Sequence, residues 1–314
     1  MITMSSKSFD IAILGHIALD VIITDNGVVY NSLGGAPTYA GFTSKVFNCN
    51  VVLISKVGYD FEDKFVNRFL RASIVVDYLK VVRKPTTRFL IRYFDDNRLL
   101  KLLSRCECIF PGDLPLDLKV KSIFISPICR EIPLTALKAI LSHYGDVSFL
   151  ALDIQGFVRD FTPNGHVKLT KWPFNINLLK LFHVVKSSYG ELTSALNVSS
   201  VYDGIKLLRK MGVKIIIVTL GKGGSLLCFS SNLWHIPSYP VKVVDPTGCG
   251  DAFMGGFIAN YLGSGDPLEA ASYGSSAASF IAESLGSSNF GFRSEIEERV
   301  DWIMDNIRFV QSFD

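Results

Sequence analysis

The stretch that decides the fold reads VVDPTGCGDAFMGGF and spans residues 243–257. An apolar strand is expected to end at Asp245, a proline and a glycine then force a turn, and a helix begins near Gly250 or Asp251. The first amides of a helix have no partner within it, and the helix dipole adds positive potential at the same place. The sequence therefore predicts an anion site, of a kind that holds phosphate, where strand, turn and helix meet.

Asp251 stands at the expected start of this helix. A carboxylate in that place can take the proton of an alcohol that attacks a phosphoryl group, because the hydroxyl loses its proton late in a loose transition state. Aspartate is also a common helix cap, which is the alternative role. The glycines around Asp251 favour the catalytic role over the cap.

Outward from this stretch, short β-branched runs alternate with helical segments along the chain, a pattern typical of a parallel sheet with crossover helices. We expect strands at residues 11–14, 51–57, 75–82, 123–126, 149–152, 181–186, 215–220 and 241–244. Helices are expected at 61–71, at 200–211 and through most of the chain after residue 244, including a last helix at 296–309. Ser200 is a plausible cap for the second of these helices, and Gly212 follows its end.

Two segments interrupt the alternation. Residues 20–29 resemble an extended ribbon, and residues 86–103 resemble a hairpin that turns at 95–97. Such strands can extend the main sheet, but we prefer a small lid over a cleft, because both segments leave the α/β core near its expected ligand end. The chain is then a single domain of residues 1–314, with a lid formed by segments about 17–35 and 84–104.

Composition restricts the function classes. Hydrophobic residues make up 48% and charged residues 19%, which argues against disorder, and the net charge of +3 is carried by scattered basic residues, so we expect no nucleic-acid partner. No run approaches the ~20 apolar residues of a membrane span, and we expect no membrane association and a cytoplasmic location. The six cysteines form no C-x-x-C and the five histidines show no metal-ligand spacing, so a zinc site is not expected.

A second glycine cluster, TLGKGGS at residues 219–225, follows a strand of nearly pure isoleucine and valine. It lacks the spacing and the Lys-Ser/Thr pair of a Walker A loop. A simple hairpin turn would have the same composition. The end of a buried parallel strand is nevertheless where α/β sheets bind ligands, so nucleotide binding stays open for this loop.

Five stretches of the chain, taken together, resemble the motifs of the ribokinase-like (PfkB) carbohydrate kinases. DPTGCGD at 245–251 resembles the family's C-terminal signature, GHIALD at 15–20 its early Gly…Asp motif, and LGGA at 33–36 its Gly-Gly motif. SYGE at 188–191 stands where the family has N-x-x-E, and TLGKGG at 219–224 matches its nucleotide loop. The motifs occur in the family's order and cover nearly the whole chain.

The resemblance implies a Rossmann-like α/β fold, with a mainly parallel central sheet flanked by helices and a small β lid. It also implies an ATP- and Mg²⁺-dependent kinase with a sugar or polyol acceptor. In that transfer Asp251 is the base, and the anion hole is Gly248, Cys249 and Gly250. The substrate residues are Asp20, Gly34 and Gly35; the nucleotide residues are Ser188, Glu191, Thr219, Gly221 and Gly224. Glu191 would hold Mg²⁺ through water, and Asp245 and Thr247 are weaker candidates for holding a monovalent cation such as K⁺.

Departures from the family pattern bear on the substrate. Ala36 stands where the family often has Asn or Lys, which removes a polar contact to a pentose or hexose, and Ser188 replaces the Asn of N-x-x-E. Ribose and fructose therefore become less attractive acceptors.

Within the family the chain is most similar to archaeal myo-inositol kinases, on the stretches RLLKLL at 98–103, PICREIP at 127–133 and DIQGFVR at 153–159. Asp153, Gln155 and Arg159 would then project into the substrate cleft, where paired donors and acceptors suit a polyol. The alternative is that Asp153 and Gln155 only cap a loop.

The leading hypothesis is thus a kinase that phosphorylates a small polyol, with myo-inositol as the first candidate. The alternatives are a nucleoside kinase of the same family and a non-catalytic sensor that binds sugar and nucleotide. A dinucleotide-dependent oxidoreductase is disfavoured, because no G-x-G-x-x-G follows the first strand. The expected partners are a small polyol or sugar and a nucleotide, with the protein a monomer or homodimer.

Overall fold

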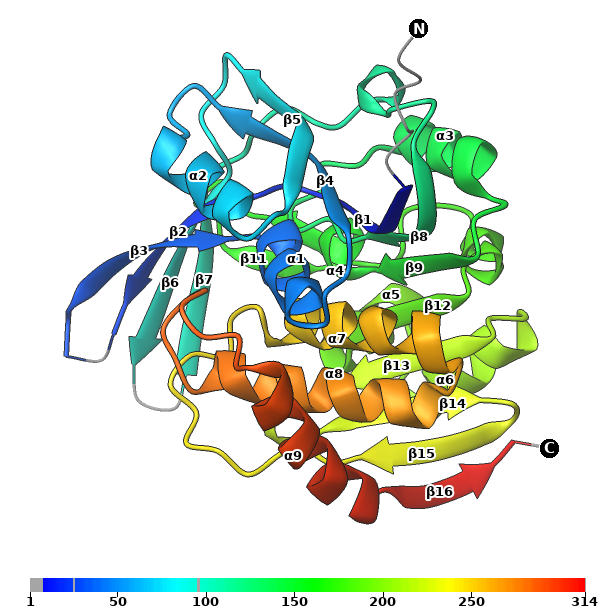
Figure 1. Ribbon diagram of the computed structural model, residues 1–314. Coiled ribbons are helices and arrows are strands. Elements are labelled where there is room, and N and C mark those ends of the chain that lie inside the picture. The colour runs from blue at the N-terminus through cyan, green and yellow to red at the C-terminus, as the bar shows by residue number, and fades with distance from the viewer. Residues whose placement is uncertain (1–7, 25, 95–96, 314) are drawn as a thin grey trace, which may run out of the picture.

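The computed structural model describes residues 8–24, 26–94 and 97–313. Within them, one sheet of ten strands forms the centre of the molecule (Figure 1). From edge to edge the strands are β16 (Arg308–Ser312), β15 (Asn232–Ile236), β14 (Ser225–Phe229), β13 (Ile215–Thr219), β12 (Val184–Ser188), β9 (Phe149–Asp153), β8 (Lys119–Ile125), β1 (Ser8–Leu14), β4 (Val51–Gly58) and β5 (Val75–Val82). From β13 to β5 all neighbours pair in parallel, and β14, β15 and β16 continue the sheet antiparallel.

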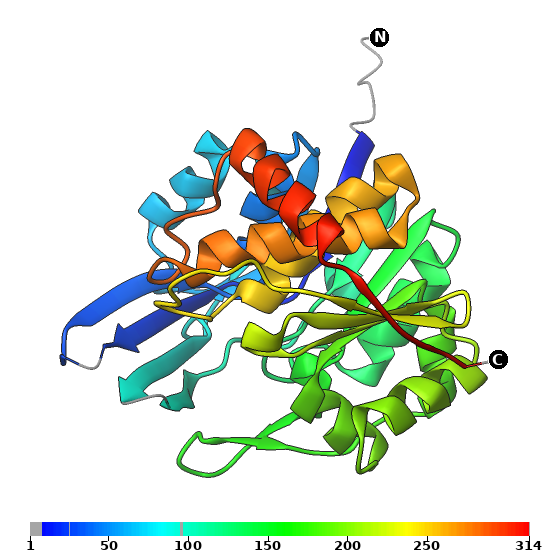
Figure 2. The ribbon, with the colours of Figure 1, turned by 90° about the horizontal axis from the view of Figure 1, so that it is seen from below.

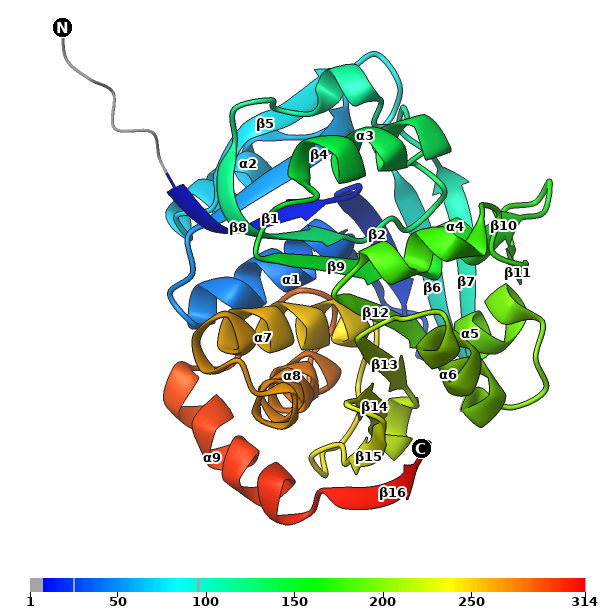
Figure 3. The ribbon, with the colours of Figure 1, turned by 90° about the vertical axis from the view of Figure 1, so that its right-hand side faces the viewer.

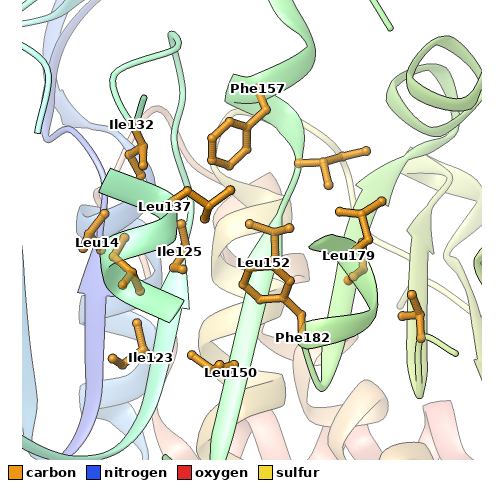
Figure 4. Close-up of a cluster of buried hydrophobic side chains, with 14 of the residues drawn as sticks. Leu14, Ile123, Ile125, Ile132, Leu137, Leu150, Leu152, Phe157, Leu179 and Phe182 are labelled. Atoms are coloured by element: carbon orange, nitrogen blue, oxygen red, sulfur yellow. The ribbon is translucent and has the colours of Figure 1, made fainter. Parts of the chain in front are cut away.

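The parallel strands are apolar on both faces, because helices cover the sheet on both sides. In β1, Ala12 and Leu14 belong to one core cluster, while Ile11 and Ile13 belong to the cluster on the opposite face. Strands β8, β9 and β13 alternate in the same way. Figure 4 shows one of these clusters, in which side chains of adjacent strands meet Leu137 of α3 (Leu134–Tyr144). The unbroken apolar runs in the sequence are thus strands buried on two faces.

The helices divide between the two faces according to the core cluster that they join. One face carries α1 (Ala36–Val46), α2 (Asp63–Arg71), α7 (Cys249–Ser264), α8 (Pro267–Ala282) and α9 (Arg293–Asp305). The other carries α3, α4 (Gln155–Val158), α5 (Tyr189–Leu196) and α6 (Val201–Lys210). In Figures 2 and 3, α7, α8 and α9 lie on one side of the strands and α5 and α6 on the other. The expected helix at 200–211 is α6, and its Ser200 hydroxyl accepts the Asp203 N–H at 3.1 Å.

A second sheet of four strands, within the described part of the chain, stands out from the main body (Figure 1). Its order is β3 (Val29–Gly34), β2 (Ala18–Ile23), β6 (Arg88–Phe94) and β7 (Asn97–Ser104). The expected ribbon and hairpin are therefore one sheet, joined by parallel pairing of β2 with β6. Residues 95–96 of the expected turn lie outside the described residues. A short antiparallel pair, β10 (Arg159–Phe161) and β11 (Val167–Leu169), lies near β7, to which a single bridge joins it.

Three expectations about elements are wrong. Residues 241–244 form no strand: the Val244 and Asp245 amides both donate to the Ala282 carbonyl at the end of α8, so no neighbouring strand takes them up. The strand expected at 181–186 is β12, shifted toward the C-terminus, and a 3₁₀ helix at Ile176–Leu181 precedes it. The last helix ends at Asp305, after which the chain returns to the sheet as β16.

One buried cluster of side chains has the composition of a metal site. His16, Cys129 and Glu131 are buried within 4.8 Å of one another. Glu131 accepts the backbone N–H groups of His16 and Cys129, and the two His16 ring nitrogens pair with the Thr87 hydroxyl and the Glu107 carbonyl. These bonds make the cluster a structural junction between β1 and the second sheet.

Among the described residues, none of the helices combines the length and apolar character needed to span a bilayer.

Candidate active site

A cleft of about 850 Å³ opens at the carboxyl ends of the parallel strands. The second sheet forms one wall of it with Phe89, Ile91, Arg98 and Leu100. The start of α7 lies between an end lined by Asp20 and an end lined by the loop after β13. Chain segments far apart in sequence meet here because the ends of parallel strands share one edge of a sheet.

Helix α7 begins as the sequence predicts. Gly248 caps it in a left-handed conformation, with φ of 83°, and the first intrahelical bond runs from the Ala252 amide to the Gly248 carbonyl at 2.8 Å. Among the described residues, the amides of Gly248, Gly250 and Asp251 have no partner. The Cys249 amide donates to the Pro246 carbonyl at 3.3 Å. Of the four amides at residues 248–251, three therefore have no partner in the described part of the chain and are free to bind an anion.

Asp251 lines the cleft and is 9% exposed. Its Oδ1 accepts the Gln155 amide at 2.8 Å and faces the Ser126 hydroxyl at 3.3 Å. Burial raises the pKa of Asp251, and the positive charges of Lys186 and Arg159 act in the opposite direction. No described residue pairs with Oδ2, so this oxygen is available to a substrate hydroxyl.

Glu191 also lines the cleft, near the start of α5. It forms a capping box with Ser188, and its other carboxylate oxygen pairs with Arg159 at 3.1 Å. Burial alone would raise the pKa of Glu191, but Arg159, Lys186 and the Ser188 hydrogen bonds bring it below its usual range. Each oxygen keeps a lone pair, so the residue fits Mg²⁺ held through water better than a direct metal ligand.

Asp153 does not line the cleft, contrary to the expectation that it projects there. It is completely buried, and its Oδ2 pairs with Lys186 Nζ at 2.7 Å while its Oδ1 accepts the Gln155 N–H at 3.0 Å. Gln155 and Arg159 do line the cleft. In the DIQGFVR stretch, Asp153 therefore holds Lys186 inside the protein, while Gln155 and Arg159 reach the cleft.

Asp20 also lines the cleft. It is buried, and its Oδ1 has no hydrogen-bond partner among the described residues. Burial and the neighbouring Asp245 carboxylate raise the pKa of Asp20 to about 7. Gly34 lies directly against this carboxylate, and Gly35 begins α1 beside it. Tyr39, which the sequence did not single out, packs its ring on Gly248, and its buried hydroxyl is unpartnered within the described chain.

The far end of the cleft contains the second glycine loop. Thr219 ends β13, and Gly221 and Gly224 follow in left-handed conformations. All three line the cleft. Opposite them the walls are largely apolar or aromatic, with Tyr239, Pro240, Val241, Val243, Ala278 and Ala282. The apolar residues of this end offer a surface on which a flat group could pack.

Asp245 and Thr247, the expected cation ligands, lie beside the second sheet. The Asp245 carboxylate accepts N–H groups from Thr247 at 2.8 Å and Gly286 at 2.9 Å, and it accepts the Tyr93 hydroxyl from β6. Asp245 is fully buried. With these donors on the carboxylate, the residues present do not fit a directly bound cation at Asp245.

Two residues that line the cleft, Lys186 and Tyr39, are not among those predicted from the sequence. Lys186 interrupts the apolar run of β12, and a lysine inside a buried strand is the signal that could have found it. Tyr39 follows the Gly-Gly motif by four residues, one turn into α1, and such a position gave no chemical signal by itself.

Comparisons with known proteins find similar kinases. The family model for the pfkB family carbohydrate kinases matches residues 169–292. The chain is 25% identical over 266 residues to a cytidine kinase of Thermococcus kodakarensis, covering 83% of this chain and 91% of that protein. It is 29% identical over 294 residues to an inositol 3-kinase of Arabidopsis thaliana, covering 89% and 76%.

Among solved structures, a pyrophosphate-dependent kinase of the ribokinase family, in complex with a pyrophosphate analogue and myo-inositol, has a TM-score of 0.77 at 20% identity. The match covers 92% of this chain and 99% of that one. At this identity the likeness bears on the fold, and it confirms the expected α/β core with a separate small sheet.

Proposed function

Since the chain belongs to the ribokinase-like pfkB family of carbohydrate kinases, we propose that it transfers the terminal phosphoryl group of ATP to a hydroxyl of a neutral cyclic polyol, with myo-inositol as the first candidate acceptor. One observation carries the proposal: at the start of α7, three amides and one carboxylate oxygen that have no partner among residues 8–24, 26–94 and 97–313 come together. A phosphoryl group and an attacking alcohol need these two things at the same spot.

Asp251 is the base in this mechanism. Two carboxylates near it are already paired, Asp153 with Lys186 and Glu191 with Arg159, and Asp20 is assigned to bind a substrate hydroxyl. Asp251 Oδ1 is held by Gln155, which leaves Oδ2 to accept the hydroxyl proton as the new P–O bond forms. The amides of Gly248, Gly250 and Asp251 stabilise the negative charge on the phosphoryl oxygens.

Mg²⁺, when bound, would neutralise charge on the donor phosphates, and Glu191 is the residue that would hold its water ligands. The protein's own part is to keep Glu191 in place through Arg159 and the Ser188 amide. Glu191 is thus fixed before any substrate arrives.

The donor proposal is ATP rather than pyrophosphate, although a structural neighbour depends on pyrophosphate. Pyrophosphate would leave empty the apolar end of the cleft beyond Gly224. A nucleoside fits there, because its base is flat and its burial against Tyr239 and the aliphatic walls is favourable.

The acceptor proposal rests on Asp20 and Tyr39. Each has a buried polar atom to which no described residue is hydrogen-bonded, and an unpaired buried group costs about 1–3 kcal/mol. A polyol offers hydroxyls that can donate to Asp20 and accept from Tyr39, and it brings no charge. Ala36 adds no polar contact at this end, in keeping with an acceptor other than ribose or fructose.

A nucleoside acceptor is the second candidate. Phe89, Ile91 and Leu100 give the second sheet an apolar face toward the cleft, which could cover a base, and a cytidine kinase is among the relatives. The hydroxyls of a ribose would then meet Asp20.

The test is a matrix of donors and acceptors. ATP and pyrophosphate are each combined with myo-inositol, ribose, fructose and cytidine, and phosphorylated products are identified by ³¹P NMR. We expect ATP with myo-inositol to give the highest kcat/KM. Turnover of cytidine alone would replace the polyol by a nucleoside, and pyrophosphate-only turnover would overturn the donor assignment.

A further inference from the structure

Lys186 is a charged residue in the cleft to which the mechanism above gives no part. It lies on β12 after two buried valines, and its side chain is 5% exposed. Its Nζ pairs with Asp153 Oδ2 at 2.7 Å. Burying an ammonium group is costly even when it is paired, so an enzyme gains little stability from this arrangement. A buried lysine at a cleft wall therefore points to a ligand rather than to folding.

The position of the ammonium group relative to α7 indicates which ligand. A Cβ atom added to Gly250 would lie 2.6 Å from Lys186 Nζ. The ammonium group thus rests against the first turn of α7, where the Gly250 and Asp251 amides are unpartnered. The same place holds the transferring phosphoryl group in the proposed function.

Lys186 also has donors to spare. An ammonium group carries three N–H bonds. Asp153 accepts one of them, and no second acceptor exists among the described residues. The remaining donors belong to a side chain that lines the cleft, and an anion in the cleft would satisfy them.

We propose that Lys186 is a catalytic residue that contacts the phosphoryl group in transit and that Asp153 is the positioning residue that holds it there. This rests on the proposed function. In the step, the acceptor oxygen bonds to the terminal phosphorus, the bond from that phosphorus to the bridging oxygen breaks, and ADP leaves. The hydroxyl proton passes to Asp251, and Lys186 stays protonated and donates to a phosphoryl oxygen.

A structural role is the alternative, in which Lys186 only neutralises buried carboxylates. The chain contains a matched control for it. Lys56 is 7% exposed and pairs with Asp113 at 2.7 Å, and it does not line the cleft. Lys56→Met and Lys186→Met therefore each remove a buried lysine from an ion pair of the same length.

The kinetic test compares these two variants. We expect Lys186→Met to lower kcat by about 10²–10³, as when one donor to a transition-state anion is lost, with the acceptor KM within about threefold of wild type. Lys56→Met should lower thermal stability and keep kcat. If Lys186→Met keeps kcat within about threefold while losing stability like Lys56→Met, Lys186 is structural and the proposal is wrong.

A second readout is the pH profile. The titratable groups that interact electrostatically with the Asp251 carboxylate are Lys186, Arg159, Asp20, Asp153, Tyr39 and Cys249. Among the neighbours that lower the pKa of Asp251, Lys186 has the largest effect. Its removal should therefore move the acidic limb of kcat/KM to higher pH, whereas Lys56→Met should leave the limb in place. An unmoved limb in Lys186→Met contradicts the proposed closeness of Lys186 and the base.

Asp153→Asn tests the positioning role. It keeps the shape of the side chain but removes its charge, so Lys186 stays present and loses its ionic partner. We expect kcat to fall about tenfold with the acceptor KM unchanged. A variant with wild-type kcat would show that Lys186 needs no anchor.

A binding experiment separates this inference from the proposed function. ADP with aluminium fluoride mimics a phosphoryl group in transit, and calorimetry needs no turnover. Wild type and Lys56→Met should bind ADP with aluminium fluoride more tightly than ADP alone. In Lys186→Met the ratio of these two affinities should be about tenfold smaller. Equal preference in all three proteins overturns the role of Lys186, whatever the acceptor matrix shows.

Discussion

Replacing Asp20 by Asn should raise the free energy of unfolding of the protein without substrate and lower its catalytic activity. Asp20 is buried beside Asp245 with one carboxylate oxygen unpaired, an environment that disfavours its charge. Asparagine has nearly the same shape and carries no charge. The variant therefore removes the unfavourable charge and turns one acceptor oxygen into an N–H donor, so a substrate hydroxyl loses the ionised acceptor to which it would donate.

The magnitude follows from the pKa of Asp20, which burial and Asp245 raise from 3.8 to about 7. A raised carboxyl pKa means that folding disfavours ionisation, so the cost appears as the pH rises above the unfolded value and becomes constant above the folded value. At about 1.4 kcal/mol per pKa unit, the cost is about 2 kcal/mol at pH 5 and about 4 kcal/mol at pH 8. Asp20→Asn should remove most of it.

The assay is urea unfolding at pH 5 and pH 8, followed by tryptophan fluorescence. The stability gain of Asp20→Asn should be larger at pH 8 by about 2–3 kcal/mol. Asp10→Asn is a control of opposite sign: burial alone would raise the pKa of Asp10, but the Asn50 amide and Lys121 hold it below its usual range. That variant should be destabilised at pH 8. If Asp20→Asn gains nothing between pH 5 and pH 8, the assigned environment of Asp20 is wrong.

Three further outcomes are expected. Asp251→Asn should lower kcat by about 10²–10⁴ and leave ATP affinity within a few-fold, measured by initial rates and calorimetry; unchanged turnover would remove it as the base. Gly248→Ala should reduce both activity and thermal stability, because a Cβ at this left-handed position would also collide with the Tyr39 ring; a stable and fully active variant would contradict that geometry. Tyr93→Phe removes the hydroxyl that joins β6 to Asp245 and should raise the acceptor KM several-fold with little change in kcat; an unchanged KM would show that this link does not hold the second sheet over the acceptor.

Local signals in the sequence are sufficient to predict where α7 begins. A proline, a left-handed glycine and a short polar stretch after an apolar run determine a turn and a helix start within a few residues, and the structure has that start at Cys249. The apolar run before it, at residues 241–244, predicts a strand that the structure does not contain. Whether residues 241–244 pair with a strand depends on what lies beside them, and here the end of α8 takes their amides.

Non-local geometry explains the errors at the site. Asp153 stands at the end of β9, where a side chain can point to the cleft or along the sheet. Its direction depends on the neighbouring strand, in which Lys186 is its register partner. The register of β9 against β12 sets this pair, and no pattern within either segment encodes it.

The two glycines at the start of α7 are there for different reasons, and the difference bears on the role of Lys186. Gly248 is required by its backbone, which has φ of 83°. Gly250 has an ordinary helical conformation, so its own backbone would accept alanine, and the atom that an added Cβ would meet is Lys186 Nζ at 2.6 Å, which would have to move. The glycine at 250 therefore makes room for the ammonium group beside the unpartnered amides. If so, Lys186→Met should leave room for alanine at 250, and the double variant should be no less stable than Lys186→Met alone, whereas Gly250→Ala in the wild-type background should displace the lysine.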